Sequence, residues 1–239
     1  MINTKINFEK YWDFLDDKFD DLLEKGFLRL PSISSLDLEQ VDQLISSQIS
    51  KTTYTELTKE HKLFIEQILL EKCLVPKLYE LAQKEFGYQG SISNQYHIAR
   101  SVIPGDQKYR AHFDSHIFTL VIPIRIPKPD EEHGTIGELV FFPNVRKFPK
   151  NPLTDLFGKI WFKQYSSKSG MNRLSQKKNM NTNSFLNYEP LLFIGNKVFH
   201  SNNPVSSSLD SHRLTLLAHF FDPFPNSSVG SLLRKIRSR

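Results

Sequence analysis

The sequence contains one cysteine, Cys73, and lacks long hydrophobic runs. A single cysteine excludes an intramolecular disulfide and any zinc or iron–sulfur site built from several thiolates. No stretch reaches the about 20 apolar residues of a membrane-spanning helix, and the N-terminus lacks an apolar core followed by small cleavage residues. These absences predict a cytoplasmic protein that is neither secreted nor inserted in a membrane, and no membrane partner is expected.

Charged residues are unevenly distributed along the chain. Lysine and arginine give a net charge of +5 and concentrate in residues 146–178 and in the tail 234–239, whereas the first predicted helix is acidic. Net charge alone identifies a partner poorly, so we interpret the basic residues as solvated surface and expect no nucleic-acid partner. Hydrophobic residues make up 39% of the 239 residues, which is enough for one folded core. We therefore predict a single domain over residues 1–239.

The first third of the chain has the apolar spacing of helices. Apolar side chains recur every three or four positions in residues 7–25, with aspartates between them. Gly26 ends this helix, and residues 27–31 follow as a short strand. The same reasoning predicts further helices over residues 37–47, over residues 55–72, and from about Pro76 to Gly87. Residues 1–90 are thus predicted to be a helical support.

After Gly90 the pattern changes to the alternation of β-strands. We predict strands over residues 93–103, 117–126, 137–142, 191–194, 197–201 and 212–221. Gly195 and Asn196 separate two of these strands and suit a tight hairpin turn with positive φ. Helices followed by short strands predict an α+β fold dominated by a double-stranded β-helix, a jelly-roll or cupin-like barrel, with its core in residues 91–223.

A long polar stretch interrupts the predicted strands in residues 144–190. It contains one β-like segment, residues 159–165, and a run rich in Ser, Asn and Lys over residues 166–187. A loop of this length inside a compact domain is either a lid over a site or a disordered insert, and the sequence leaves both open. Residues 224–239 are predicted to be a basic tail.

His112 and Asp114 lie two residues apart, just before a predicted strand. On an extended chain this spacing places both side chains on one face. A further histidine, His200, ends a predicted strand much later in the chain. Two histidines and one carboxylate at one point form the facial triad of non-haem Fe(II) oxygenases, whereas an isolated His-x-Asp pair is common in surface turns.

Arg213 and Thr215 share one face of the last predicted strand. An arginine directed inward is costly unless it meets a carboxylate, and a dicarboxylate co-substrate would supply one. Alternatively, the Arg213 head group reaches solvent or pairs with an internal acidic residue. The residues alone leave this choice open.

Taken together, the order His-x-Asp, distal His and Arg-x-Thr resembles the Fe(II)- and 2-oxoglutarate-dependent oxygenase superfamily, most closely its prolyl-4-hydroxylase-like branch. The segments that carry the resemblance are Tyr109–Asp114, Phe118–Ile126, Gly137–Pro143 and His200–Val205. Collagen-type prolyl 4-hydroxylases usually have lysine where this chain has Arg213, so the resemblance does not specify proline as the substrate.

The resemblance implies an enzyme that uses Fe(II), 2-oxoglutarate and O2. Its metal ligands would be His112, Asp114 and His200. The distal carboxylate of 2-oxoglutarate would bind Arg213, assisted by Thr215 and Tyr109. Oxidative decarboxylation would release succinate and CO2 and hydroxylate an amino-acid-like, peptidyl or other small substrate.

Other residues and other functions are weaker candidates. Tyr96, Arg100 and His219 are possible substrate contacts, with ordinary packing as the alternative. His116 lies four residues after His112, but a zinc-binding pair of this spacing would need a Glu directly after His112. We therefore expect His116 to lie beside the site and not to bind the metal. The rival functions are a non-catalytic cupin or jelly-roll binding protein and a cupin-type metalloenzyme that does not use 2-oxoglutarate.

Overall fold

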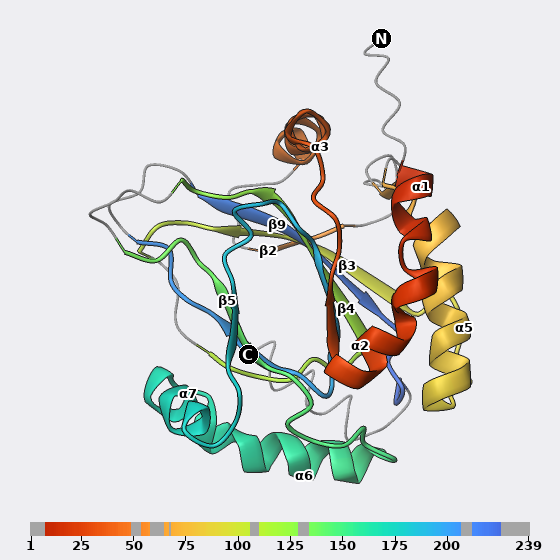
Figure 1. Cartoon of the computed structure of the whole chain (residues 1–239), viewed down its shortest axis with the longest axis vertical. Coiled ribbons are helices and arrows are strands. Elements are labelled where there is room, and N and C mark those ends of the chain that lie inside the picture. The colour runs from red at the N-terminus through yellow and green to blue at the C-terminus, as the bar shows by residue number, and fades with distance from the viewer. Residues whose placement is uncertain are drawn as a thin grey trace.

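The computed structural model describes residues 8–48, 54–57, 65–66, 68–105, 110–128, 134–206 and 212–225. Two antiparallel sheets lie at its centre, with α1, α2 and α5 side by side at the right of Figure 1 and α6 and α7 along the lower edge. Among the described residues no helix is long and apolar enough to cross a membrane. The predicted basic tail lies outside the described residues from position 226 onward.

The N-terminal helix predicted over residues 7–25 is divided in two. α1 covers Phe8–Asp13, a 3-10 turn η1 covers Asp16–Lys18, and α2 covers Phe19–Lys25. Aspartates compete with helical hydrogen bonds through their own side chains. Lys77 of α5 stabilises the break, because its Nζ donates to Asp13 Oδ1 at 3.1 Å and to Asp16 Oδ2 at 2.8 Å.

Two of the other helix predictions are confirmed. α3 covers Ser35–Gln48, and α5 covers Val75–Phe86 with Gly87 as its left-handed cap at φ 63°. The prediction of a helix over residues 55–72 is wrong at its start, where β2 runs over Tyr54–Glu56. β2 pairs with the neighbouring strand β3, and this tertiary pairing overrides the local apolar spacing. A π-helical turn, η3, covers Leu70–Leu74, and residues 58–64 and 67 lie outside the described residues.

The large sheet has six strands in the order β1-β7-β4-β9-β3-β2. Their bounds are Phe27–Arg29 for β1, Leu191–Ile194 for β7, Phe118–Arg125 for β4, Arg213–Phe220 for β9 and Gln95–Val102 for β3. The small sheet has the order β6-β5-β8, with β6 at Asn181–Asn183, β5 at Leu139–Phe142 and β8 at Phe199–Asn202. Most predicted strands are therefore present.

The predicted hairpin around Gly195 is wrong. β7 already pairs with β1 on one side and β4 on the other, so it has no free edge for β8, which pairs with β5 in the small sheet. The turn instead carries the chain from one sheet to the other. Gly195 is not at positive φ. A Cβ there would lie 2.8 Å from His116 O and 2.9 Å from Thr119 Oγ1, so close packing explains the glycine.

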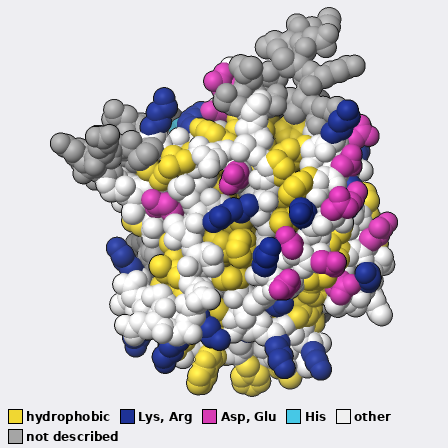
Figure 2. Space-filling model, viewed as in Figure 1, with side chains coloured by type: hydrophobic (Ala, Val, Ile, Leu, Met, Phe, Trp, Pro, Cys, Tyr) yellow, Lys and Arg dark blue, Asp and Glu magenta, His cyan; other side chains and the backbone are white. Residues whose placement is uncertain are grey.

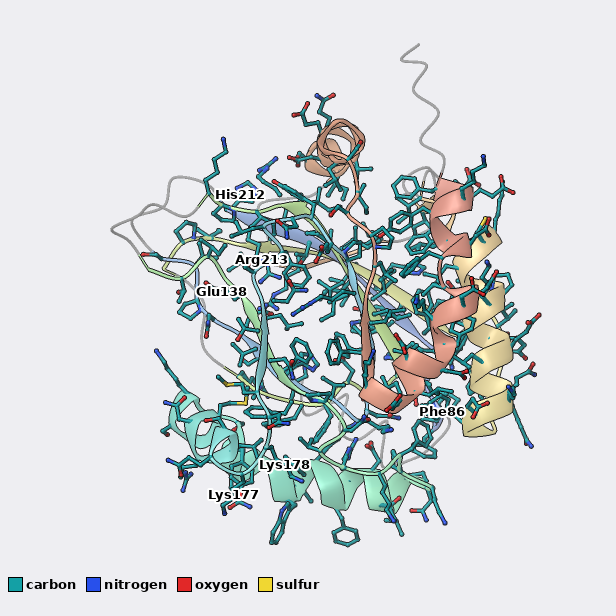
Figure 3. All side chains as sticks on the ribbon, viewed as in Figure 1. Phe86, Glu138, Lys177, Lys178, His212 and Arg213 are labelled. Atoms are coloured by element: carbon teal, nitrogen blue, oxygen red, sulfur yellow. The ribbon has the colours of Figure 1, made fainter. Side chains whose placement is uncertain are left out.

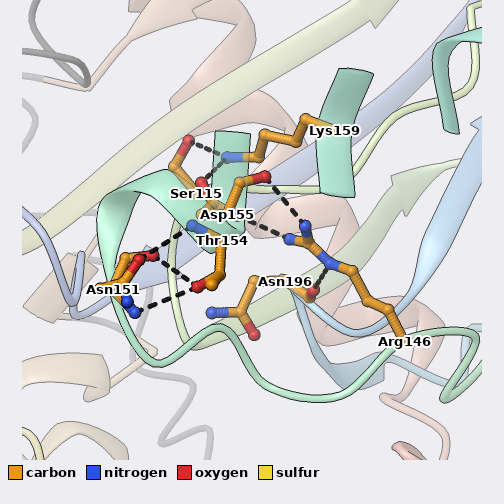
Figure 4. Close-up of polar contacts among 7 residues, drawn as sticks. All are labelled: Ser115, Arg146, Asn151, Thr154, Asp155, Lys159 and Asn196. Carbon is orange, nitrogen blue, oxygen red and sulfur yellow. Dashed lines mark hydrogen bonds and ion pairs between the residues drawn. The ribbon is translucent and has the colours of Figure 1, made fainter. Parts of the chain in front are cut away.

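The stretch between residues 144 and 190 folds into helices. α6 covers Pro152–Phe162, a 3-10 turn η4 covers Lys163–Tyr165, and α7 covers Lys168–Ser175, so the β-like segment predicted over 159–165 is wrong. The side chains of Asn151 and Thr154 form a capping box that starts α6 (Figure 4). Asp155 bonds Arg146 and Lys159 in the same view, each at 2.7 Å, which ties α6 to the chain before it.

Apolar side chains fill both faces of the large sheet. Alternate residues of β4, such as Phe118 and Leu120, pack with the helices in one cluster, while Val121 packs with residues of both sheets in a second. This two-sided burial confirms the prediction made for residues 117–126. Trp12 is fully buried in the helical cluster and donates from Nε1 to Ile68 O at 2.8 Å.

Phe118 offers a test of the helix-to-sheet packing. Its ring is fully buried and contacts Phe86 of α5 edge-on, with ring centroids 5.7 Å apart. We expect Phe118→Ala to lower the free energy of unfolding by about 3–5 kcal/mol because it leaves a cavity. Phe157→Ala, at a side chain that is 67% exposed, should change it by less than about 0.5 kcal/mol. Urea unfolding followed by circular dichroism measures both, and equal effects would contradict this packing.

Candidate metal centre

The backbones of His112 and His200 form an antiparallel bridge. His112 N donates to His200 O at 2.9 Å, and His200 N donates to His112 O at 3.0 Å. Directly opposed residues of an antiparallel pair project to the same face. The two imidazole centroids are accordingly 4.6 Å apart. One short bridge thus joins residues that are far apart in the sequence.

Asp114 completes a compact group of three. Its carboxylate lies 3.6 Å from His112 Nε2 and 3.8 Å from His200 Nε2. One ligand atom from each residue lies within 4.8 Å of the other two. Asp114 and His200 are buried, whereas the His112 side chain is 45% exposed, so the group is open to solvent on the side of His112.

Hydrogen bonds at the Nδ1 atoms fix how the two histidines face this point. His112 Nδ1 lies 3.1 Å from Arg110 O, and His200 Nδ1 lies 3.2 Å from Val198 O. A backbone carbonyl can only accept, so Nδ1 is the donor in both rings, and Nε2 is the ring atom left to face a metal. Donation of the second ring nitrogen to a carbonyl is the usual orientation of metal-binding histidines. Burial lowers the pKa of His200 to about 4, which keeps that ring neutral.

Thr119 and His219 hold the Asp114 carboxylate in place through a chain of hydrogen bonds. Thr119 Oγ1 donates to Asp114 Oδ2 at 2.6 Å and lies 3.0 Å from His219 Nδ1, from which it accepts. Burial by itself would raise the pKa of Asp114, but His200 and His219 hold it well below its usual range. The carboxylate is therefore an anion whose Oδ2 is engaged.

Arg213 occupies the other end of β9, where its side chain is almost completely buried. Its Nη1 donates to Gly137 O, and its guanidinium carbon lies 5.1 Å from the centroid of the Phe185 ring. The Nε atom has no hydrogen-bond partner among the described residues. Burial, and then Arg100, lowers the pKa of Arg213 to about 9, against an opposing effect of Glu138. Gly137 is at φ 83°, and a Cβ there would lie 3.1 Å from Arg213 Cδ.

Glu138 is the internal acidic residue that influences Arg213, but its carboxylate binds other groups. Glu138 is labelled with Arg213 in Figure 3, but its oxygens accept from Asn203 Nδ2 at 3.2 Å and from Ile136 N at 3.4 Å. No carboxylate in the described ranges forms an ion pair with Arg213 within 4.0 Å. The guanidinium is thus a buried cation whose hydrogen bonds are incomplete.

Strand register places the remaining candidates around this site. Thr215 lies opposite Arg100, whose Nη1 donates to Asn202 Oδ1 at 2.6 Å. His219 lies opposite Tyr96, with ring centroids 6.2 Å apart, and His116 stacks on His219 at 5.3 Å. The structure therefore brings the predicted residues together on β3 and β9. Tyr109 lies outside the described residues.

Two residues of the site were not predicted from the sequence. Thr119 is a polar residue within an apolar strand, and this contrast could have marked it in the sequence as a candidate site residue. Asn202 connects Arg100 to Gly137 O, to which its Nδ2 donates at 3.2 Å, and no local pattern marks it. Both residues act through tertiary contacts that cross between strands.

Solved structures supply the comparison, because no protein-family model and no curated protein matches the sequence. A prolyl 4-hydroxylase from Phytophthora capsici has a TM-score of 0.61 and 15% identity, over 95% of this chain and 69% of that one. A prolyl hydroxylase from Trichoplax adhaerens, in complex with a peptide fragment of hypoxia-inducible factor, has a TM-score of 0.55 and 14% identity, over 92% and 94% of the two chains. A Pseudomonas putida prolyl-4-hydroxylase has a TM-score of 0.53 and 12% identity, over 87% and 98%.

The chain has the fold of the prolyl 4-hydroxylases. Identities of this size establish the similarity of the backbone only. They leave the chemistry of the site to be argued from the side chains that this chain places on the fold.

Thr119 provides a test of the group around Asp114. Thr119→Val removes the hydroxyl that holds Asp114 Oδ2 while keeping the side-chain shape. We expect the affinity for a divalent metal to fall by roughly ten- to a hundredfold, as for other residues that orient metal ligands. Titration calorimetry with Mn²⁺ measures this. Thr119→Ser retains the hydroxyl and should bind like the parent, and equal binding by the valine variant would contradict the assignment.

Proposed function

We propose that this protein is an Fe(II)- and 2-oxoglutarate-dependent dioxygenase that hydroxylates an amino-acid-like, peptidyl or other small substrate. The observation that carries the proposal is the convergence of His112, Asp114 and His200, with one ligand atom from each within 4.8 Å. Two imidazoles and one carboxylate with open positions around them suit non-haem Fe(II). The two sheets are then the two halves of a double-stranded β-helix, as the similarity to prolyl 4-hydroxylases supports.

The donor set fits iron. Both Nδ1 atoms donate to backbone carbonyls, which leaves the Nε2 atoms for a metal, and the Thr119 hydroxyl binds Asp114 Oδ2, so Asp114 Oδ1 is the oxygen left for it. His112, Asp114 and His200 would therefore be the metal ligands. Thr119 and His219 would be positioning residues that keep the carboxylate in one orientation.

Arg213 fits the distal carboxylate of 2-oxoglutarate. A buried guanidinium without a carboxylate partner is costly, and a planar carboxylate matches its donors. The Nε of Arg213 has no hydrogen-bond partner in the described part of the chain, and Thr215 on the same face of β9 can add a hydroxyl donor. We assign Tyr109 to the same co-substrate from the sequence resemblance alone.

Iron and 2-oxoglutarate, when bound with O2, supply the oxidising power, with succinate and CO2 as the co-products. The residues of this chain hold and shield the reacting groups. Phe193 packs against the His200 ring with centroids 5.0 Å apart and keeps water from that side. His112 is the exposed member of the group, so a substrate reaches the centre from its side. Tyr96, Arg100 and His219 are the proposed substrate contacts.

The buried arginine also weighs against the rival functions. A cupin-type metalloenzyme without 2-oxoglutarate leaves Arg213 with no carboxylate to bind. A non-catalytic binding protein has no need to keep all three metal ligands together with this arginine. The peptide bound to the prolyl hydroxylase of Trichoplax adhaerens supports a peptide or a smaller amino-acid-like molecule as the substrate class.

Removal of one ligand tests the metal assignment. His112→Ala should abolish binding of Fe(II) and reduce succinate formation to background, because the affinity of a three-ligand site falls steeply when one is lost. Succinate is measured with Fe(II), 2-oxoglutarate and ascorbate, with and without O2. His212→Ala, at a histidine that contacts Arg125 rather than the centre, is the matched control. A parent protein that binds neither metal nor 2-oxoglutarate would refute the proposed function.

Substitution of Arg213 separates the co-substrate from the metal. Arg213→Ala should leave Mn²⁺ affinity unchanged and weaken 2-oxoglutarate binding by roughly ten- to a hundredfold, the value of a charged hydrogen-bonded pair. Calorimetry on the Mn²⁺-loaded protein measures both affinities. Arg173→Ala, at an exposed arginine of α7, is the control. Unchanged 2-oxoglutarate affinity in Arg213→Ala would overturn the role given to Arg213 but not that of the metal ligands.

A further inference from the structure

Helix α6 displays a row of large apolar side chains to solvent. Leu153, Phe157, Ile160 and Trp161 are 57%, 67%, 57% and 69% exposed. Their spacing of four, three and one residues places them along one side of the helix. Figure 2 shows hydrophobic side chains projecting at the lower edge of the molecule, where Figure 1 places α6. We call these four residues the α6 stripe.

The anchoring of α6 fixes which side faces outward. Phe162 packs edge-on against Phe113, with centroids 5.0 Å apart. Asp155 bonds Arg146 and Lys159, and Lys159 Nζ also reaches Ser115 Oγ at 3.2 Å (Figure 4). These contacts hold the opposite side of the helix to the rest of the chain. The α6 stripe is therefore held outward by polar and aromatic contacts and cannot rotate into the core.

The surface around the α6 stripe is strongly basic. In the described segment 144–180 the only acidic residue is Asp155, and both of its oxygens are engaged with cations. Figure 2 shows lysine or arginine on both sides of the projecting hydrophobic groups, and Figure 3 labels Lys177 and Lys178, which follow α7 at the same lower edge. The exposed lysines of this segment are Lys147, Lys150, Lys163, Lys168, Lys177 and Lys178.

We propose that the α6 stripe and its lysines bind the surface of an anionic lipid membrane. A helix with Trp, Phe and Leu on one side and lysines beside them lies in the interface plane, with the apolar side chains among the acyl chains and the lysines at the headgroups. α6 has 11 residues, and binding in the interface plane does not require it to cross the bilayer. The inference differs from the sequence-based expectation of no membrane partner, which considered spanning segments alone.

The charge and shape of this surface favour lipid over other occupants. A symmetric contact with the α6 stripe of a second copy would bring the same lysines against each other, so like charges would oppose it. A nucleic acid would match the charge and could stack on Phe157 and Trp161, but Leu153 and Ile160 offer no stacking face. The side chains project from a convex helix, and a deformable lipid surface accommodates such projections without a matching groove.

Membrane binding would bring the metal centre close to the lipid surface. α6 contacts the segment that carries the proposed ligands, through Phe162 on Phe113 and Lys159 on Ser115. The membrane-binding proposal does not depend on the proposed enzymatic function, because it rests on exposure and charge alone.

Vesicle sedimentation with the full-length protein tests the apolar part. The parent should bind vesicles made from equal amounts of phosphatidylcholine and phosphatidylglycerol. It should bind vesicles of pure phosphatidylcholine only weakly. The double variant Phe157→Ser/Trp161→Ser should partition at least about tenfold less, because two large apolar groups are removed. Phe14→Ser/Ile92→Ser, at side chains 36% and 42% exposed outside α6, is the matched control and should bind like the parent.

Charge reversal tests the electrostatic part. Lys177→Glu/Lys178→Glu should reduce binding to the anionic vesicles, and added salt should reduce binding of the parent, since surface attraction is screened. Lys84→Glu, at a lysine side chain that is 81% exposed on α5, is the control for charge alone and should have a smaller effect.

Tryptophan fluorescence reports where the contact forms. The chain has two tryptophans, Trp12 being fully buried and Trp161 being 69% exposed. Anionic vesicles should therefore shift the emission to shorter wavelength and protect it from acrylamide, and Trp161→Phe should abolish both effects.

Three outcomes would overturn the proposal. The first is a parent that binds none of the vesicles, and the second is a stripe variant that binds them like the parent. The third is stripe-dependent self-association, or stripe-dependent binding of polyuridylate, in place of vesicle binding. Circular dichroism of each variant establishes that it remains folded, which exposed positions permit.

Discussion

The backbone bridge between His112 and His200 is the interaction on which the site depends. The segment around His112 lies outside the named strands. It is held by two hydrogen bonds between His112 and His200, by one from Asp114 N to Gly195 O at 3.1 Å and by one from Ala111 N to Ser166 O at 2.9 Å. The partners belong to two parts of the chain, residues 195–200 and the residue that follows η4. The helical stretch after residue 144 therefore helps to position the ligand segment, in addition to covering it.

A second constraint is the charge distribution along the inner face of β9. His219 at one end supports an anionic carboxylate through Thr119, whereas Arg213 at the other end is a buried cation to which the described residues offer no ion-paired carboxylate. Burial of a lone charge costs several kcal/mol, as an order of magnitude. A bound ligand with a carboxylate would offset this cost for Arg213. β9 thus carries a contact to the Asp114 group at one end, through His219, and the buried guanidinium of Arg213 at the other.

Much of the fold could be predicted because the strands have strong local patterns. The strands around β3, β4, β5 and β9, the cap at Gly87 and the buried character of β4 follow from periodicity and turn residues. Strand pairing could not be predicted in the same way. The stretch at Tyr54–Glu56 pairs with β3 although its apolar residues have helical spacing. Both edges of β7 pair with other strands, β1 and β4, so β8 cannot pair with it. The helix α6 was missed because its apolar stripe faces solvent.

The sequence by itself determined which residue types are available and which neighbours share a face, since both follow from the two-residue period of a strand. It supplied His112 with Asp114, and Arg213 with Thr215, as pairs. Only the tertiary structure decided that His200 joins the first pair, that Thr119 and Asn202 complete the surroundings, and that Gly195 is required by close packing. The physical reason is that hydrogen bonds across sheets and close backbone contacts depend on pairing partners that no local window contains.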